Sequence, residues 1–561
     1  MTCVAASRRD DRASDTDILV APSPTEAPLR PRRGRELLTG LALLGVVGFG
    51  LIAFSTRWGA GLDPDSTVYV RAARSLVAGR GVALIAERGR ARPVTRFPPL
   101  YPALLATGSW LSGQDPRDCA RWVGAMFFSA SIILVGVAVA PHAGPWAGVL
   151  AATLTALSPD MLRIHSMALS EGPFLFFSLL TLYLLASHLD HSSPVRLVGA
   201  AVAASLASLS RYGGVVLIVT GVLALFLLGR GPLKRRALDS LLFGGLSCAV
   251  TVAWALRNLN VAGTIAERTL VFHPPTWNHL AAAVETISGW LLPGAPFVVR
   301  VGALLIVTTG TGIAAIVHRL PVASRDQRAP AGESLPRLIA LFMISYLSLL
   351  AFTIGFVSAD TRLDYRILSP VYATLVILVA RGCSRREGRA RAAVRVLLVP
   401  VLGAYLTAAA AFVRQAHFEG QGYASKSWQE SPTLAALQVL PASSPIFSNR
   451  PDAIAVLTGR PAARIPANFN PSTLRENPNR SAELAGMRRS VRDRKGVVVV
   501  FKRIGARGYL MSESELSAAI PLRPVKRTRD GTIYRWDSER SGATLERRSR
   551  SRAAQAGARK G

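Results

Sequence analysis

The chain contains little cysteine, histidine or acid for its length. Four cysteines and eight histidines are spread over 561 residues, without any CxxC, HxxxH or HExxH spacing. A disulfide framework or a zinc site built from these residues is therefore not expected. The 34 acidic residues are outnumbered by 66 lysines and arginines, so the formal charge is +32.

High basic charge coexists with high hydropathy, since half of the residues are hydrophobic. This combination is typical of a polytopic membrane protein whose arginines lie in loops that face the cytosol and anionic lipid. Nucleic-acid binding is the competing explanation of the charge. The basic runs lie between apolar segments instead of on one soluble domain, so we expect membrane lipids, and no nucleic acid, as partners.

About eleven segments are apolar enough to cross a bilayer, for which about 20 mostly apolar residues are needed. We therefore predict an α-helical polytopic membrane protein. The segments lie at 37–55, 123–140, 145–159, 172–188, 196–210, 213–228, 238–256, 299–317, 337–357, 367–380 and 396–413.

The distribution of arginine predicts the orientation. Loops 229–237, 318–336 and 381–395 are rich in arginine and are expected to face the cytosol, as is the amino terminus. Loop 56–122 is also basic and would face outside, but at about 65 residues its charge has little influence on orientation. The abundance of alanine, arginine and proline suggests a GC-rich bacterial source, and hence the plasma (inner) membrane.

Four regions follow from this pattern. Residues 1–36 form a basic cytosolic arm that precedes an uncleaved signal anchor, and 37–413 form the transmembrane module with 56–122 as its first outer loop. Residues 414–538 contain short β-type runs and helical stretches, which predict a small extracytoplasmic α/β domain. Residues 539–561 are expected to be a disordered basic tail.

The first outer loop contains the leading candidates for chemistry. Asp63 and Asp65 follow an apolar segment and precede a helical pattern in which Tyr69 lies one turn after Asp65, on the same face. An acid at a helix amino terminus is often only a cap, and this alternative is about equally weighted on the residues alone. The Pro98-Pro99 pair then directs the chain back towards the bilayer. An amphipathic helix held in this way would place a carboxylate just above the lipid headgroups.

The order of these motifs resembles the GT-C superfamily of membrane glycosyltransferases, of the protein O-mannosyltransferase and aminoarabinose-transferase type. The resemblance covers about residues 37–460. It is carried by DSTVYVRAARSLVAGRG, FPPLYPALLA, ALSEGPFLFFSLLTLYLL, WALRNLNVAGT, DYRILSPVYATLVILVA and IFSNRPDAIAVLTGR. It implies transfer of a sugar from a polyprenyl-phosphate donor to a lipid, glycan or protein acceptor at the outer face of the membrane, with inversion at the anomeric carbon.

The resemblance also assigns residues. Asp65 matches the family's first-loop aspartate, a catalytic base or metal-binding acid, and Glu171 matches the acid of the second loop. Ser66 occupies a place where the family often has another acid, which argues against a tightly held metal at Asp65. The resemblance leaves a divalent cation open as cofactor.

Arginines at the outer ends of apolar segments could stabilise the departing phosphate through bidentate hydrogen bonds. For any one of them, snorkelling to lipid headgroups is an equally weighted alternative. His165, His273 and His279 are interpreted as ordinary loop histidines. The candidate substrate-binding residues are Tyr69, Arg96, Arg163, Arg211, Arg257 and Arg366.

Two other function classes compete with the enzyme. A transporter or flippase would place ionisable residues near the bilayer midplane, whereas the apolar segments here are nearly free of acids. A non-catalytic membrane protein with the same fold could bind a partner through its outer domain. Replacing Asp65 by asparagine distinguishes these classes, because only the enzyme should lose activity.

Overall fold

A bundle of helices makes up most of the molecule. The computed structural model describes residues 31–85, 91–317, 334–384, 388–502 and 507–539. Each of the apolar segments predicted from the sequence overlaps one helix. The helices are α1 (Pro31–Ser55), α4 (Pro116–Ala143), α5 (Pro145–Ala156), α7 (Glu171–His191), α8 (Pro194–Ser210), α9 (Val215–Leu228), α10 (Leu233–Ala262), α12 (Phe297–Val317), α13 (Ser334–Phe352), α14 (Ser369–Ser384) and α15 (Gly388–Glu419).

Within the described residues, six helices are long and apolar enough to cross a membrane, and five shorter helices are also apolar. The bundle therefore has the character of a multi-pass membrane protein, while the number of crossings stays a prediction. Its interior is packed with leucine, alanine and phenylalanine from α1, α4, α5, α7, α8 and α14. Large apolar side chains on α10 and α12, such as Leu241 and Ile306, remain exposed, as expected for surfaces that face lipid.

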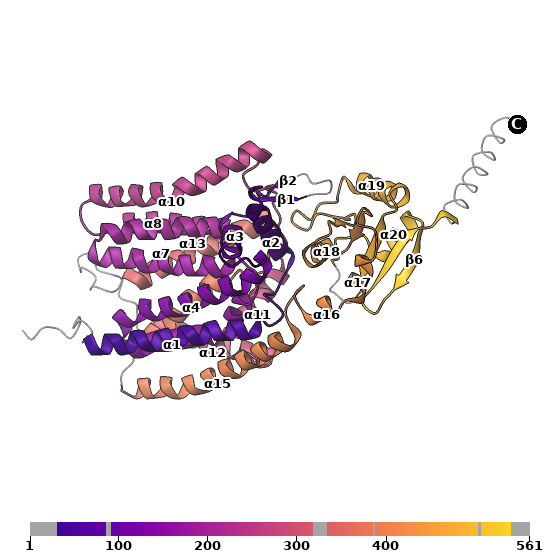
Figure 1. Cartoon of the computed structure of the whole chain (residues 1–561). Coiled ribbons are helices and arrows are strands. Elements are labelled where there is room, and N and C mark those ends of the chain that lie inside the picture. Colours follow the sequence, from indigo (N-terminus) through magenta and orange to yellow (C-terminus); the bar gives the residue numbers. More distant parts are fainter. Residues whose placement is uncertain (1–30, 86–90, 318–333, 385–387, 503–506, 540–561) are drawn as a thin grey trace, which may run out of the picture.

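One end of the bundle carries short elements that do not belong to the long helices. The first loop folds into helix α2 (Pro64–Val77), the hairpin β1 (Ala83–Ile85) and β2 (Ala91–Pro93), and helix α3 (Leu100–Ser112). Figure 1 shows them together at the end that faces the carboxy-terminal part of the chain. The helix predicted after Asp65 is thus α2. Asp63 caps it by accepting the Ser66 amide at 2.8 Å, and Pro64 occupies its first turn.

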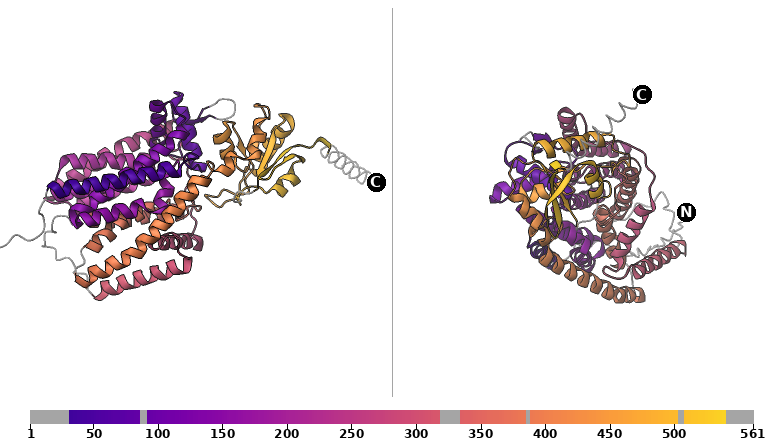
Figure 2. Two further views of the ribbon diagram at one scale, coloured as in Figure 1. Left: turned by 60° about the horizontal axis from the view of Figure 1, so that its bottom comes forward. Right: turned by 90° about the vertical axis from the view of Figure 1, so that its right-hand side faces the viewer.

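The carboxy-terminal part forms a small α/β unit beyond α15. Its five-stranded sheet has the order β4-β3-β5-β7-β6, with β3 parallel to β4 and β5, and β7 antiparallel to β5 and β6. Figure 2 shows this unit over the end of the bundle. Its elements are α16 (Lys426–Gln429), α17 (Pro432–Gln438), β3 (Ile446–Ser448), α18 (Pro451–Thr458), β4 (Ala463–Arg464), α19 (Arg480–Asp493), β5 (Val497–Phe501), α20 (Glu513–Ala519), β6 (Leu522–Arg527) and β7 (Gly531–Trp536).

A shared apolar core joins α2 and α3 to this unit. Tyr69 and Leu105 from the first loop belong to the same buried cluster as Trp428, Ile446 and Val497 from the carboxy-terminal unit. Removing large apolar side chains from water stabilises such contacts by about 25 cal/mol per Å². The orientation of α2, and so of the acids at its amino terminus, therefore depends on both parts of the chain.

Candidate active site

Three carboxylates converge on one guanidinium group at this end of the bundle. Nη1 of Arg366 donates to Asp63 at 2.7 Å, Nη2 donates to Asp65 at 3.1 Å and Nε donates to Glu171 at 2.8 Å. The acids come from two loops that are more than 100 residues apart in sequence, and the arginine comes from a third. We call these four residues the carboxylate cluster. Its geometry brings together three residues that the sequence singled out as candidates, Asp65, Glu171 and Arg366.

Backbone pairing explains how the first two loops meet. The Gly61 amide donates to the Ser166 carbonyl at 2.9 Å, and the Ala168 amide donates to the Gly61 carbonyl at 2.8 Å. On the other side of the same strand-like segment, the Tyr423 amide donates to the Leu62 carbonyl at 2.8 Å. The segment that ends at Asp63 is thus held between the second loop and the end of α15.

Glycine is required where these segments touch. Gly422 has φ +52°, and a Cβ on it would lie 2.0 Å from the Leu62 carbonyl oxygen. Replacing Gly422 by alanine should lower the free energy of unfolding by at least about 2 kcal/mol, because a left-handed conformation and a backbone clash act together. Thermal unfolding of the detergent-solubilised protein measures this.

Gly403→Ala is a matched control for Gly422→Ala, since Gly403 lies within α15 and a Cβ there meets nothing within 4 Å. The control should be neutral or slightly stabilising. Equal melting temperatures for the two variants would show that the contact with Leu62 is not needed to hold the first loop in place.

The three carboxylates differ in exposure, which separates their chemical roles. The side chain of Glu171 is 1% exposed, that of Asp63 18% and that of Asp65 39%. Burial raises the pKa of Asp63, Arg366 opposes this, and Asp65 adds to it by repulsion. Oδ1 of Asp65 accepts no hydrogen bond from the described part of the chain. Asp65 is therefore the carboxylate best placed to contact a substrate.

Glu171 is held more tightly than the other acids. Its Oε1 also contacts Nη1 of Arg211 at 2.7 Å, so two guanidinium groups share one carboxylate oxygen. The second oxygen, Oε2, is buried and has no hydrogen-bond partner in the described residues. Burial alone would lower the pKa of Arg366, but Glu171, Asp63 and Asp65 together raise it. Arg366 thus remains charged and neutralises part of the cluster.

Tyr69 lines the cluster from α2, as its place one turn after Asp65 predicted. Its hydroxyl shares a hydrogen bond with Ser170 Oγ at 3.0 Å, and its ring packs edge-on against Phe97 and Tyr101. Burial raises its pKa, as do the charges of Asp65 and Glu171, so the phenol stays protonated. Tyr69 links α2 to the second acidic loop; a direct contact with substrate stays a prediction.

Three predicted substrate-binding arginines form no ion pair with the described acids of the carboxylate cluster. Arg257 donates to the Val94 carbonyl at 3.2 Å and stacks on Trp254, so it fixes the β1–β2 hairpin. Arg163 lies 5.1 Å from the Tyr365 ring centroid, and Arg96 lies 6.0 Å from that of Phe97. Their substrate contacts stay predictions.

The sequence reasoning missed a cation beside the cluster. Burial and repulsion by Arg96 lower the pKa of Arg268, while Asp65 raises it and Arg211 lowers it further. These four groups are therefore electrostatic neighbours. Arg268 lies in the loop after α10, where part of its surface stays open to solvent although neighbouring chain segments reduce the hydration of its guanidinium group. The local sequence around Arg268 did not indicate a role at the site, because this loop comes near Asp65 only in the folded chain.

Two further residues near the cluster are Asp63, to which the resemblance gave no role, and His165, which was interpreted as a loop histidine. Asp63 supplies a second acid two positions before Asp65, although Ser66, whose hydroxyl donates to Asp63 at 2.9 Å, occupies the place where the family often has one. The interpretation of His165 as a loop histidine is wrong, since it ends helix α6 (Pro159–His165) and is buried. Burial lowers its pKa to about 4, so the imidazole beside Glu171 is neutral at neutral pH.

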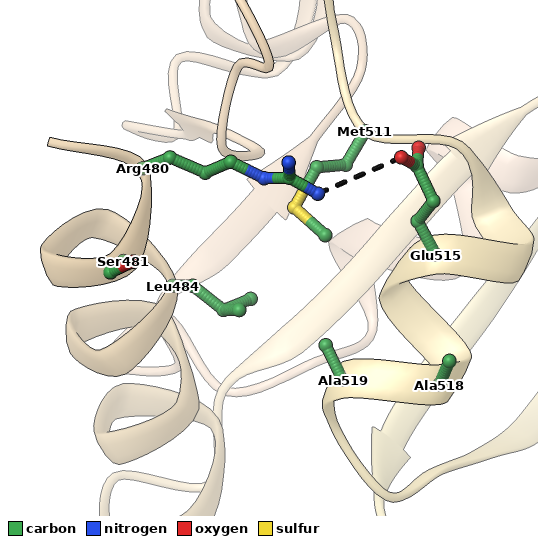
Figure 3. Close-up of a pocket in the computed structure, with 7 residues that line it drawn as sticks. All are labelled: Arg480, Ser481, Leu484, Met511, Glu515, Ala518 and Ala519. Atoms are coloured by element: carbon green, nitrogen blue, oxygen red, sulfur yellow. Dashed lines mark ion pairs between the residues drawn. The ribbon is translucent and has the colours of Figure 1, made fainter. Parts of the chain in front are cut away.

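Within the described ranges, no group of three or more histidine, cysteine, aspartate or glutamate side chains is arranged to hold a metal ion. The carboxylates that a divalent cation would use are bound to Arg366. A depression of about 500 Å³ between α19 and α20 does not include any of these residues. Figure 3 shows the Arg480–Glu515 ion pair across it, beside Met511 and above Leu484. We place the candidate active site at the carboxylate cluster because three carboxylates share one guanidinium group there, and one of these acids, Asp65, is partly exposed.

Comparisons with known proteins concern the family and the fold of the chain. Residues 96–255 match the family model of dolichyl-phosphate-mannose-protein mannosyltransferases. The fold is similar to that of ArnT from Cupriavidus metallidurans bound to undecaprenyl phosphate. That match has a TM-score of 0.56 and 14% identity, and it covers 90% of this chain and 98% of the other. No sequence among the curated proteins matches this chain.

The oligosaccharyltransferase of Archaeoglobus fulgidus has the same fold. Its complex with zinc and sulfate has a TM-score of 0.51 and 14% identity, over 86% of this chain and 70% of that one. The same enzyme in complex with an inhibitory peptide and a dolichol-phosphate has a TM-score of 0.50 and 13% identity, and the match covers 87% of this chain and 72% of that one. The resemblance to GT-C glycosyltransferases that the sequence motifs indicated is thus confirmed.

Proposed function

We propose that this chain, which has the fold of the GT-C membrane glycosyltransferases, transfers a sugar from a polyprenyl-phosphate donor to a hydroxyl of a lipid, glycan or protein acceptor. Transfer takes place at the outer face of the bacterial plasma membrane, where the carboxy-terminal unit lies. The observation that carries the proposal is the convergence of Asp65 and Glu171 on Arg366, beside Arg211 and Arg268.

The proposed reaction forms one bond and breaks another at the anomeric carbon. Asp65 takes the proton of the acceptor hydroxyl, whose oxygen attacks the anomeric carbon from the face opposite the phosphate. The C–O bond to the phosphate breaks through an oxocarbenium-like state, and its electron pair leaves with polyprenyl phosphate. The configuration is therefore inverted. Asp65 suits this role because it is the most exposed of the three carboxylates.

Arginines supply the positive charge that the leaving phosphate requires. Arg211 is partly neutralised by Glu171 and Arg366 by three acids. Arg268 and Arg96 have no ion pair with a described residue. We assign the donor phosphate to Arg268, with Arg96 beside it, because a guanidinium can bind phosphate oxygens through two parallel hydrogen bonds.

The most direct test supplies the purified protein with a set of labelled polyprenyl-phosphate sugars and a mixture of candidate acceptors. Consumption of one labelled donor, with release of polyprenyl phosphate, supports the proposal. Failure of every donor, together with donor-independent movement of lipid across proteoliposome membranes, would favour a flippase instead.

Replacing Arg268 by glutamine should raise the KM for the donor about tenfold or more, since one charge-assisted contact contributes about 1.5–3 kcal/mol. Initial rates against donor concentration measure this. The matched variant Arg257→Gln removes an arginine that binds the hairpin backbone, so it should lower the melting temperature more and change the KM less. The opposite pattern would assign the phosphate to Arg257.

A further inference from the structure

A second basic site lies on the side of α2 that faces the carboxy-terminal unit. A pocket of about 230 Å³ between α2 and α18 is lined by Arg71, Arg74, Ser75 and Arg80 from the first loop, and by Ala455, Gly459 and Pro461 from the carboxy-terminal unit. Figure 1 shows α18 directly beside α2. Among the described residues, no acidic side chain lines this pocket, and none of its lining residues belongs to the carboxylate cluster.

We propose that this pocket binds a phosphate ester through its arginines and Ser75. Its volume is below the roughly 300–1,000 Å³ of sites for drug-sized ligands, so it fits a single anionic group and not a whole lipid or oligosaccharide. The site goes beyond the proposed transfer reaction and does not depend on it.

Ser75 provides an observation that is independent of the charge. Its side chain is 1% exposed, and its hydroxyl is buried without a hydrogen-bond partner in the described residues. A buried hydroxyl that remains unpaired costs about 1–3 kcal/mol. An oxyanion in the pocket would supply the missing acceptor, because a hydroxyl donates readily to a charged oxygen.

Neighbouring acids leave the pocket positive. Arg74 makes a bidentate contact with Asp115, at 2.8 and 3.0 Å. Asp452 attracts Arg71, but its carboxylate also accepts from Arg507 at 2.8 Å. These two carboxylates are therefore shared among Arg71, Arg74 and Arg507, and Arg80 has no ion pair with a described residue. An anion in the pocket would balance the remaining charge.

The position of Arg80 is fixed by the backbone. Gly79 and Gly81 flank it with φ +69° and +72°, and the Arg80 amide donates to the Ser75 carbonyl at 2.9 Å. This turn keeps Arg80 at the carboxyl end of α2. Arginines at such an end can simply stabilise the helix dipole, and in that case the pocket would have no affinity for phosphate.

The test measures binding of inorganic phosphate and glycerol phosphate to the full-length protein in detergent, by calorimetry at constant ionic strength. Arg80→Gln and Ser75→Ala should each raise the dissociation constant for phosphate, and Arg80→Gln should raise it about tenfold or more. Arg494→Gln, which removes an exposed arginine elsewhere in the same unit, should leave it unchanged. Binding that is the same in all four proteins, or that Arg268→Gln abolishes, would overturn the proposal.

The source of the phosphate is distinguished in lipid nanodiscs. If the ligand is a lipid headgroup, nanodiscs that contain phosphatidylglycerol should suppress the binding of glycerol phosphate in the wild type, compared with neutral nanodiscs. If the ligand is a soluble phosphate ester, the two nanodiscs should give equal affinities. Sugar transfer measured in parallel keeps the two proposals separate, since loss of phosphate binding in Arg80→Gln does not require loss of transfer.

Discussion

Replacing Asp65 by asparagine should reduce sugar transfer by about 10²- to 10⁴-fold and leave the protein folded. An amide has nearly the same shape as the carboxylate and can still accept from Nη2 of Arg366, but it cannot take a proton from the acceptor. Asp65 is 39% exposed and accepts only one of the three hydrogen bonds from Arg366, so its contribution to stability is small. Initial rates with labelled donor, together with the melting temperature, measure the two effects.

Asp118→Asn is a suitable control for this variant. Asp118 is an exposed acid in the first turn of α4, in the same loop region, and has no ion pair with a described residue. The Asp118→Asn variant should transfer sugar at the wild-type rate. If Asp65→Asn retained full activity while the protein still consumed a labelled donor, Asp63 would become the candidate base, since it is the next most exposed carboxylate of the cluster.

The sequence was sufficient to predict the helices and part of the cluster. Long apolar segments predict bundle helices because backbone polar groups must be paired within lipid. The acid at the start of α2 and the position of Tyr69 followed from the local periodicity of that helix. Glu171 came from motif resemblance and Arg366 from its place at the outer end of an apolar segment, and in the structure Arg366 contacts both Glu171 and Asp65.

Other features required the fold itself. Arg257 lies near the end of α10 and Arg268 lies in the loop that follows. Arg268 is within electrostatic range of Asp65, whereas Arg257 binds the hairpin backbone. Their sequence contexts do not reveal this difference, because it depends on contacts with residues more than 150 positions away. The backbone hydrogen bonds of Gly61 and Leu62 with segments 166–168 and 422–423 likewise cannot be predicted from composition, although they determine where Asp63 and Asp65 lie.

Replacing Arg366 should have the largest effect on both stability and activity. Arg366→Gln leaves three carboxylates without their common counter-ion, and Glu171 among them is buried. Breaking a buried ion pair by removing one partner costs about 3–5 kcal/mol. We expect a value near the lower end, because Asp63 and Asp65 are partly exposed and Arg211 still contacts Glu171. Arg366→Lys should recover part of the stability, but one compact ammonium nitrogen cannot reach all three carboxylates as the three guanidinium nitrogens do.

The pH dependence of the stability lost in Arg366→Gln provides a second, independent measurement. In wild type, Arg366 lowers the pKa of Asp63, while burial and repulsion by Asp65 raise it; without Arg366 only the two raising effects remain. The variant then gains stability relative to wild type as Asp63 takes up a proton, so the difference in melting temperature should shrink as the pH falls from about 7 towards 5. Arg362→Gln, an exposed arginine in the same loop, should show no such dependence. A difference that stays constant with pH would mean that Arg366 acts through packing, and the electrostatic account of the cluster would be wrong.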